Sequence, residues 1–335
     1  MENRITSHIV VAGGGSWGTA LAHVLASASH EVTMLVRSEE AAVHIREKHE
    51  NPRYLAGKKL HFLVSATSDE RVLERCSLFV LAVPCQHQRV FLSGVKNYLP
   101  SDAVIVNAAK GLETGTSLRM SEVAGEVMPE FSSRYAVLSG PSFAAEVMDG
   151  SPTAVVLGCA DDSLGAELRS VFSTPYFRCY SSTDVMGVEM GGALKNVMAI
   201  SAGVCDGLGL GDNSRAALIS RGLAELSRIG CGMGAHPATF MGLSGLGDLI
   251  LTCTGNLSRN RQVGLRLGQG ESLQQIIDSL GMVAEGVATS FEARSLAEKL
   301  GVEAPITEAV CRILEGKISA RRVVLDLMNR ALKEE

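Results

Sequence analysis

Three glycines near the N-terminus have the spacing of a phosphate-binding turn. Gly13, Gly15 and Gly18 spell G-x-G-x-x-G directly after the apolar run Ile9–Ala12. In this pattern the first glycine allows a tight turn, the second lets a pyrophosphate approach the backbone, and the third lets a helix pack on its strand. The helix then presents N–H groups and a partial positive charge to the phosphates. The pattern predicts dinucleotide binding, and a merely structural turn is the alternative.

Two lysines follow apolar sequence, where a charge is unusual. Lys110 comes after the run 103–109 and therefore lies at the carboxyl end of a predicted buried strand, the edge at which open α/β sheets bind ligands. Lys195 is the only charged residue between Met190 and Val204. A buried lysine is costly unless it is paired, and desolvation makes it a better proton donor. Both lysines are candidates for chemistry, with an exposed surface position as the alternative for each.

A carboxylate is isolated in the same way. Asp248 is the only charged residue from Pro237 to Leu257, so it is a candidate partner for Lys195. Its alternative role is an ordinary N-cap for a helix over 249–252.

Two further segments carry groups that suit an anion. The run Asn256–Arg261 includes Ser258, Arg259 and Asn260, and a guanidinium fork beside neutral donors fits a phosphate. A surface loop without a ligand is the alternative. The turn 139–144, with Gly140 and Ser142, follows the predicted strand Tyr135–Leu138 and can bring donors to the sheet edge. By itself it indicates only a turn.

The residue after the second predicted strand bears on cofactor choice. Arg37 follows the strand Glu31–Val36, about twenty residues after the glycine turn, where NAD-specific sites usually carry Asp or Glu. An arginine there accommodates a 2′-phosphate. Glu39 and Glu40 come later, past the strand end. The sequence therefore predicts that NADP(H) is accepted and preferred.

The elements that must position these residues change character along the chain. Several of the β-rich runs are continuously apolar, as in strands buried on both faces, and they alternate with helical stretches. The expected strands are Ile9–Ala12, Glu31–Val36, Leu78–Val83, Ala103–Ala108, Tyr135–Leu138, Ala154–Leu157 and Phe177–Cys179. After about Thr183 the sequence is helical and punctuated by glycine; one helix is expected over Ser214–Ile229, capped by Asn213 and stopped by Gly230. The fold class is therefore α/β: an N-terminal Rossmann-type, doubly wound, mostly parallel sheet over 1–185, followed by an all-helical domain over 186–335.

Composition excludes several classes of protein. The chain has 335 residues, enough for two domains, with 46% hydrophobic residues and a formal net charge of −5. An acidic chain without a basic block does not favour nucleic-acid binding, and no apolar stretch is long enough for membrane insertion. The eight cysteines are scattered without a C-x-x-C pair, so we expect reduced, mostly buried thiols and no metal site.

Taken together, these residues resemble the bacterial NAD(P)-dependent sn-glycerol-3-phosphate dehydrogenase family over essentially the whole chain. The blocks Gly191–Val197 and Gly245–Leu249 are far more specific than a glycine loop. The matching stretches are Gly13–Ala20, Ala109–Glu113, Leu138–Ala145, Gly187–Ile200, Ser220–Ser227, Pro237–Thr254, Ser258–Arg261, Val283–Gly286 and Pro305–Glu308.

The resemblance implies reversible reduction of dihydroxyacetone phosphate to sn-glycerol 3-phosphate, which supplies phospholipid synthesis. It implies Lys195 as the proton-transferring residue and a cytoplasmic enzyme that is often a homodimer. The cofactor would be bound by Ser16, Trp17, Arg37, Lys110, Ala144, Arg259, Val283 and Glu285, besides the glycine turn. The substrate would be surrounded by Lys110, Gly140, Ser142, Lys195, Asp248, Ser258, Arg259 and Asn260.

Two other readings stay open on the residues alone. Hydroxyacid, ketopantoate and sugar-acid dehydrogenases also combine a Rossmann domain with a helical domain, so the fold does not settle the substrate. A regulator that senses NADP without turnover belongs to a different class. Ser258, Arg259 and Asn260 favour a phosphorylated substrate, and the isolated Lys195 and Asp248 argue against a sensor.

Overall fold

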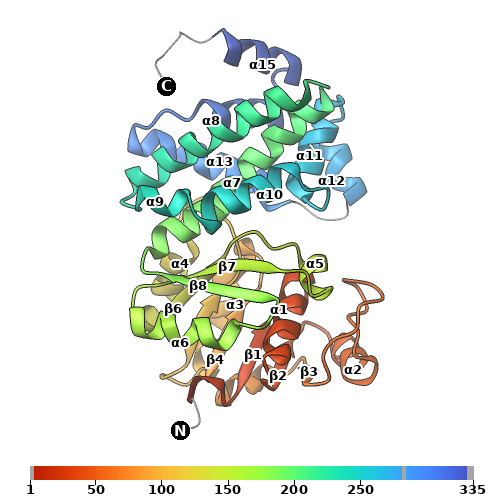
Figure 1. Ribbon diagram of the computed structural model, residues 1–335, viewed down its shortest axis with the longest axis vertical. Helices are drawn as coiled ribbons and strands as arrows, with labels where there is room; N and C mark the ends of the chain where they lie inside the picture. The colour runs from red at the N-terminus through yellow and green to blue at the C-terminus, as the bar shows by residue number, and fades with distance from the viewer. Residues whose placement is uncertain (1–3, 281–283, 330–335) are drawn as a thin grey trace. The chain divides into compact units, whose positions relative to one another are not determined.

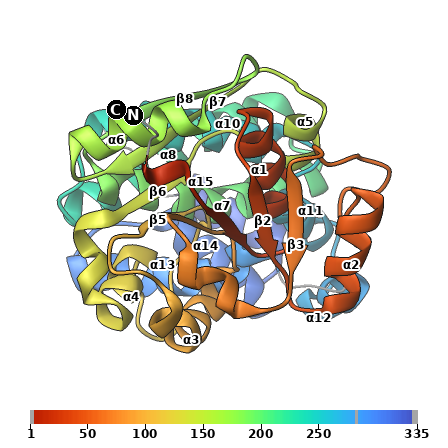
Figure 2. The ribbon, with the colours of Figure 1, turned by 90° about the horizontal axis from the view of Figure 1, so that it is seen from below.

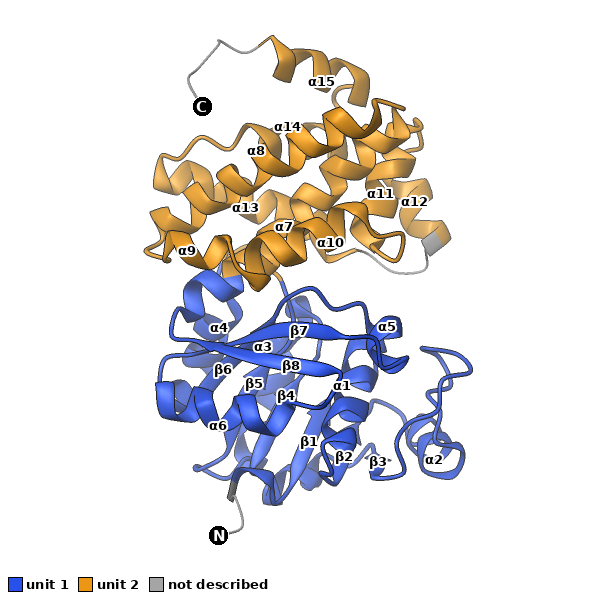
Figure 3. Cartoon of the chain, in the orientation of Figure 1, with its two compact units in different colours: residues 1–110, 118–189 blue, residues 111–117, 190–335 orange. Residues whose placement is uncertain are grey.

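The computed structural model describes residues 4–280 and 284–329 (Figure 1). The chain divides into two compact units, shown in Figure 3: unit 1 comprises residues 1–110 and 118–189, and unit 2 comprises residues 111–117 and 190–335. The division falls at 189/190 rather than at the expected 185/186, and the short segment Gly111–Ser117 belongs to unit 2. The chain therefore passes between the units three times, after residues 110, 117 and 189.

Unit 1 is built on one eight-stranded sheet with the order β3-β2-β1-β4-β5-β6-β7-β8. All neighbours are parallel except β6 and β7, which are antiparallel. The direction of winding reverses between β1 and β4, and in such sheets ligands bind at the carboxyl ends of the strands near this point. The strands are β1 (Ile9–Ala12), β2 (Val32–Leu35), β3 (Val64–Thr67), β4 (Leu78–Leu81), β5 (Val104–Asn107), β6 (Tyr135–Ser139), β7 (Thr153–Cys159) and β8 (Phe177–Ser182).

Both faces of this sheet are covered. Alternate residues of its central strands therefore enter two different apolar cores. In β1, Ile9 and Val11 join one apolar cluster, whereas Val10 and Ala12 join the other. Figure 2 shows α1, α5 and α6 on one face and α3 and α4 on the opposite one. The helices of this unit are α1 (Ser16–Ser27), α2 (Glu39–Lys48), α3 (Cys85–Val95), α4 (Met120–Val127), α5 (Ala144–Met148) and α6 (Asp162–Phe172).

One strand was not expected from the sequence. The strand β3, with the sequence Val-Ser-Ala-Thr, pairs with β2 at the edge of the sheet. Its residues alternate between buried and less buried positions, so it lacks the continuous apolar run of the central strands. The seven expected strands are all present; β1 has the expected ends, β8 ends three residues later than expected, and the ends of the others differ by at most two residues.

Unit 2 is helical throughout its described part, apart from turns and short connections. None of the described helices is long and apolar enough to cross a bilayer. The helix α7 (Val185–Gly207) begins in unit 1 and continues into unit 2. The other helices are α8 (Gly211–Gly232), α9 (Pro237–Phe240), α10 (Asp248–Thr254), α11 (Arg259–Gly268), α12 (Leu273–Leu280), α13 (Glu285–Leu300), α14 (Pro305–Leu314) and α15 (Ala320–Met328).

The expected limits of α8 were wrong. The helix begins at Gly211 and runs through Gly230, so Asn213 lies inside its first turn and Gly230 does not stop it. A Cβ atom at Gly230 would lie 2.2 Å from the Phe240 ring, so this glycine serves close packing with α9. The sequence shows a glycine but not the ring that faces it.

Candidate functional site

In unit 1, the glycine turn joins β1 to α1 in the geometry that the spacing predicts. Gly13 has φ +114°, and a Cβ atom there would lie 2.6 Å from the carbonyl oxygen of Ala82 at the end of the neighbouring strand β4. A Cβ atom at Gly18 would lie 2.0 Å from the oxygen of Gly13, whereas nothing lies within 4 Å of the corresponding position at Gly15. Two of the glycines thus permit close packing, and the middle one leaves open space.

This open space lies at the N-terminus of α1. Gly15 is the N-cap and has no side chain to cap the first N–H groups, which suits an incoming phosphate. Ser16 and Trp17 form the first turn, and the buried indole Nε1 of Trp17 has no hydrogen-bond partner among the described residues. The site therefore fits the pyrophosphate of a dinucleotide.

Arg37 lies two residues beyond the end of β2 and is exposed. The acidic residue nearest to that strand end in α2 is engaged elsewhere, because Glu39 accepts a hydrogen bond from Arg46 at 2.7 Å and one from Ser68 at 2.7 Å. The position that receives the adenosine ribose in such folds is therefore flanked by a guanidinium rather than by an uncommitted carboxylate.

A residue that sequence reasoning missed fastens the glycine turn. The buried amide of Asn51 donates to the carbonyl oxygen of Gly14 at 2.9 Å and to Oγ1 of Thr19 at 2.8 Å. Its Oδ1 accepts from the backbone N–H groups of Arg53 and Tyr54 at 3.0 and 3.1 Å. Asn51 thus holds the loop after α2 against the turn. A single amide in a polar loop gives no sequence signal of this role.

Three predicted residues meet at the carboxyl ends of β5 and β6. The half-buried Lys110 donates from Nζ to the carbonyl oxygen of Gly140 at 3.0 Å, and Ser142 Oγ donates to the same oxygen at 3.0 Å. Gly140 has φ +132°, and a Cβ atom there would lie 2.9 Å from Cα of Val155. Ala144 begins α5 directly after this turn. The ammonium group of Lys110 and the hydroxyl of Ser142 therefore lie at the carboxyl ends of the strands, the end of the sheet that also carries the glycine turn.

In unit 2, the predicted pairing of Lys195 with Asp248 is present. Lys195 Nζ donates to Asp248 Oδ1, and the two side chains are only 8% and 1% exposed. Thr252, which the sequence analysis missed, accepts from Lys195 Nζ at 3.0 Å and donates to the main-chain oxygen of Asp248 at 2.6 Å. The spacing i, i+4 between Asp248 and Thr252 puts both on one face of α10 and was the available signal. Asp248 is the first residue of α10 rather than its cap, which is Gly247.

The approach of α7 to the segment before α10 explains this pair. Gly191 lies one turn before Lys195, and a Cβ atom there would lie 2.6 Å from the carbonyl oxygen of Ser244. The residues Leu243–Gly247 form a π-helical turn that leads directly into Asp248. Both glycine-rich motifs therefore let two backbones come close enough for the lysine and the carboxylate to meet.

The start of α11 is fastened to the residue after Lys195. Asn260 donates from Nδ2 to Oδ1 of Asn196 at 2.9 Å, and its own Oδ1 accepts from the N–H of Gly286 at 3.0 Å. Ser258 is buried and caps α11 by accepting from the N–H of Arg261 at 3.2 Å. Asn260 thus connects α7, α11 and α13.

The remaining predicted residues of this unit differ in exposure and in what is described. Arg259 is exposed in the first turn of α11, and the partly buried Glu285 begins α13. Val283 lies outside the described residues. Near Lys195, burial raises the pKa of the Cys253 thiol to about 12, so this thiol stays protonated at neutral pH. Within 4–280 and 284–329, no three or more His, Cys, Asp or Glu side chains are grouped to hold a metal ion.

A glycine turn on a doubly wound sheet, followed by a helical unit with a buried lysine–carboxylate pair, defines the class of two-domain nicotinamide-dependent dehydrogenases. Within that class the chain belongs to the NAD-dependent glycerol-3-phosphate dehydrogenase family. Residues 8–165 match the family's N-terminal model and residues 184–325 match its C-terminal model.

Curated relatives are similar over nearly the full length of both chains. The glycerol-3-phosphate dehydrogenase [NAD(P)+] of Desulfovibrio desulfuricans is 59% identical over 327 residues, covering 98% of each chain. That of Oleidesulfovibrio alaskensis is 54% identical over 328 residues, covering 98% of this chain and 99% of the relative.

The fold is also similar to that of solved dehydrogenase structures. The crystal structure of glycerol-3-phosphate dehydrogenase from Coxiella burnetii has a TM-score of 0.91 at 36% identity and covers 97% of this chain and 100% of that one. A D-mandelate dehydrogenase with NADH and anilino(oxo)acetate has a TM-score of 0.62 at 14% identity, covers 95% of this chain and 99% of that one, and shares the fold alone.

Proposed function

We propose that this enzyme catalyses the reversible, NAD(P)H-dependent reduction of dihydroxyacetone phosphate to sn-glycerol 3-phosphate. The observation that carries the proposal is the buried amine of Lys195, held by Asp248 and Thr252. As hydride reaches a carbonyl carbon, negative charge develops on the oxygen, and a fixed ammonium group both stabilises that charge and donates the proton. The names of the curated relatives support this reaction over that of other dehydrogenases with the same fold.

The proposed cofactor site uses the residues expected from the resemblance. When bound, the dinucleotide supplies the hydride. Gly13, Gly15 and Gly18 would form its turn, and Arg37 would bind the 2′-phosphate of NADP(H), which makes NADP(H) the preferred cofactor. The other residues proposed to contact it are Ser16, Trp17, Lys110 and Ala144 of unit 1 and Arg259, Val283 and Glu285 of unit 2.

The proposed substrate residues divide by chemistry. Lys195 would exchange the proton at the carbonyl oxygen, and Asp248 would keep its amine oriented. Arg259 would bind the phosphate bidentately, with Ser258 and Asn260 adding neutral donors. Lys110, Gly140 and Ser142 are the proposed contributors from unit 1. A gripped phosphate fixes the orientation of the ketone and lowers the entropic part of the barrier.

In the cell, we propose a cytoplasmic homodimer whose product supplies the glycerol backbone of phospholipids. The relatives' names support a small phosphorylated substrate, and the charge of −5 does not favour nucleic acid as a partner.

The test is the loss of reduced-nicotinamide absorbance with dihydroxyacetone phosphate, comparing NADPH with NADH and using unphosphorylated dihydroxyacetone as the control. We expect rapid oxidation that depends on the phosphate and is faster at low concentrations of NADPH than of NADH. Equal rates with both ketones would overturn the phosphate site. No oxidation with any small ketone, together with tight NADPH binding, would instead support a cofactor sensor.

A further inference from the structure

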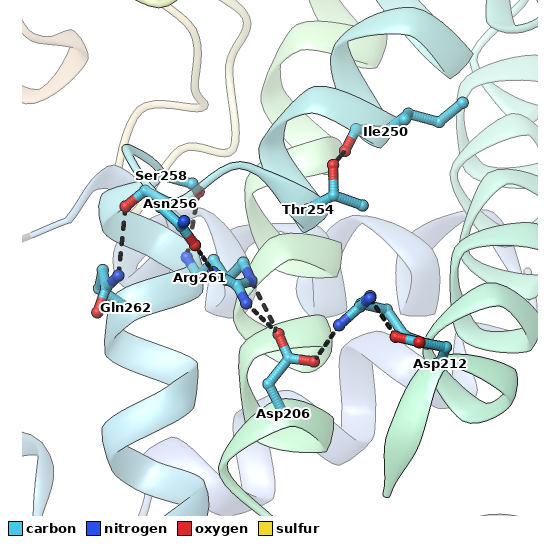
Figure 4. Close-up of polar contacts among 9 residues, drawn as sticks. Asp206, Asp212, Ile250, Thr254, Asn256, Ser258, Arg261 and Gln262 are labelled. Carbon is cyan, nitrogen blue, oxygen red and sulfur yellow. Dashed lines mark hydrogen bonds and ion pairs between the residues drawn. The ribbon is translucent and has the colours of Figure 1, made fainter. Parts of the chain in front are cut away.

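An ion pair in unit 2 joins the helix that carries Lys195 to the helix that begins at Arg259. Arg261, in the first turn of α11, donates from Nε and from a terminal nitrogen to Asp206 Oδ2 of α7 at 2.8 and 2.7 Å. The two side chains are 13% and 11% exposed. Figure 4 shows Arg261 between Asp206 and Asn256, whose Oδ1 accepts a further hydrogen bond at 3.1 Å.

The second oxygen of Asp206 is also engaged. Arg215 of α8 donates to Asp206 Oδ1 at 2.8 Å and pairs with Asp212. The carboxylate is therefore held from both sides, and the Arg261 guanidinium is directed toward protein groups. The sequence analysis had placed Arg261 in the phosphate-binding run, but its contacts give it a different task from that of Arg259.

The backbones of α7 and α11 are in direct contact near this pair. A Cβ atom at Gly203 would lie 2.0 Å from the carbonyl oxygen of Arg261, and one at Gly264 would lie 1.9 Å from that of Ile200. Glycines at the contact supply no side chains that interlock the two helices, whereas a two-nitrogen ion pair has a defined geometry and favours one register.

What the pair holds in place is the start of α11. The N–H of Arg261 bonds to Ser258 Oγ at 3.2 Å, and Asn260 reaches Asn196, beside Lys195, at 2.9 Å. Asp206 is eleven residues beyond Lys195, about 16 Å along α7 and too far for direct contact, whereas its bond to Arg261 joins it to the start of α11.

We propose that Asp206 and Arg261 are positioning residues. They set where the start of α11, with Ser258, Arg259 and Asn260, lies along the axis of α7. They fix the distance between the groups that bind the substrate phosphate and the amine that donates the proton. This inference rests on the proposed function, because it takes these three residues to be the phosphate site.

The test uses Arg261→Lys and Asp206→Asn in the full-length enzyme, with saturating NADPH. Lysine keeps the charge but loses the two-nitrogen fork, so α11 is no longer held in one orientation. For either variant we expect KM for dihydroxyacetone phosphate to rise about tenfold, with kcat within about threefold and kcat/KM for unphosphorylated dihydroxyacetone unchanged. The double variant should be less impaired than the product of the two single effects, because both changes break one contact.

Arg294→Lys is the matched control. Arg294 of α13 pairs with Glu315 at 2.8 Å, also between elements of unit 2, with exposed fractions of 26% and 19%. It should leave both KM values unchanged. If Asp206 and Arg261 have a purely structural role, the variants will have a lower melting temperature but no selective rise in KM for dihydroxyacetone phosphate. That result would overturn the proposal. Wild-type enzyme without phosphate-dependent turnover would instead overturn the proposed function, so the two failures are distinguishable.

Discussion

At the scale of single residues, the clearest expectation concerns the buried amine. Lys195→Ala removes both the proton donor and the positive charge near the developing alkoxide, so turnover should fall by about 10²- to 10⁴-fold. The dissociation constant for NADPH should change little, because the glycine turn and Arg37 belong to unit 1. Steady-state kinetics and a fluorescence titration with NADPH measure the two quantities, and near-normal turnover would remove Lys195 from its proposed role.

Thiol chemistry gives a second expectation at this scale. Seven of the eight cysteines are buried, and burial raises the pKa of Cys76, Cys179, Cys253 and Cys311 to about 12, so they carry almost no thiolate at pH 8. Cys231 is the half-buried exception. A disulfide reagent should therefore modify about one thiol in the native protein, and Cys231→Ser should abolish that fast reaction. Fast modification of several thiols in this variant would contradict the burial.

Which of these residues the sequence reveals depends on contrast with the surroundings. Lys195 and Asp248 are isolated charges in apolar sequence, and a charge in such a place needs a partner. Asn51 is a neutral polar residue of the kind that fills any loop, so nothing marks it before its partners are known, and Thr252 is marked only by its i, i+4 spacing from Asp248. The sequence reasoning thus predicted the ion pair of Lys195 and Asp248 and missed the two neutral residues Asn51 and Thr252.

At the scale of elements, glycine packing between α7 and α11 gives a sharp contrast. Gly264→Ala places a methyl group 1.9 Å from the oxygen of Ile200, and only separation of the helices relieves the clash. We expect a loss of about 1–3 kcal/mol or more in unfolding free energy, because a close-packed contact is overfilled. Gly94→Ala, near the end of α3 with nothing within 4 Å of the added atom, should be neutral or stabilising by up to about 1 kcal/mol. Denaturant unfolding measures the unfolding free energy of both variants. Equal changes in Gly264→Ala and Gly94→Ala would contradict the close packing of α7 against α11.

A carboxylate from α8 caps another helix. Glu225 is fully buried and accepts from the N–H groups of Ile306 and Thr307, both at 2.8 Å, and from Thr307 Oγ1 at 2.7 Å. This gives a structural reason for the motif Pro305–Glu308, which contains none of the proposed site residues. Glu225→Gln turns one acceptor into a donor facing donors, so stability should fall by about 1–3 kcal/mol while KM for the substrate stays unchanged. A raised KM with unaltered melting temperature would assign Glu225 to the site instead.

Element boundaries show where local sequence stops being informative. The central strands were predictable because burial on both faces demands continuous apolar runs. The edge strand β3 and the length of α8 depend on neighbours distant in the sequence: β2 pairs with the former, and the Phe240 ring explains the glycine in the latter. Glycine in particular can mark a turn, a helix end or a close contact, and only the facing atoms distinguish these.

At the scale of the whole molecule, cofactor binding should appear as stability. NADPH at about one hundred times its dissociation constant should stabilise the folded protein by about 2.7 kcal/mol, which raises the melting temperature by several degrees. In Arg37→Ala the shift produced by the same concentration of NADPH should shrink, whereas the shift with NADH should not. Differential scanning fluorimetry measures both, and an equal loss with the two cofactors would show that Arg37 does not recognise the 2′-phosphate.

The short excursion Gly111–Ser117 restricts how such a protein can be recombined. Its backbone and hydroxyl donors at Gly115 and Ser117 bond to the carboxylate of Glu292, at 2.8 and 2.7 Å, although these residues are separated by about half the chain. A single genetic crossover near residue 189 would give the hybrid this segment from one parent and Glu292 from the other. Exchange of cofactor domains between relatives would therefore succeed most readily where the two partners are inherited together.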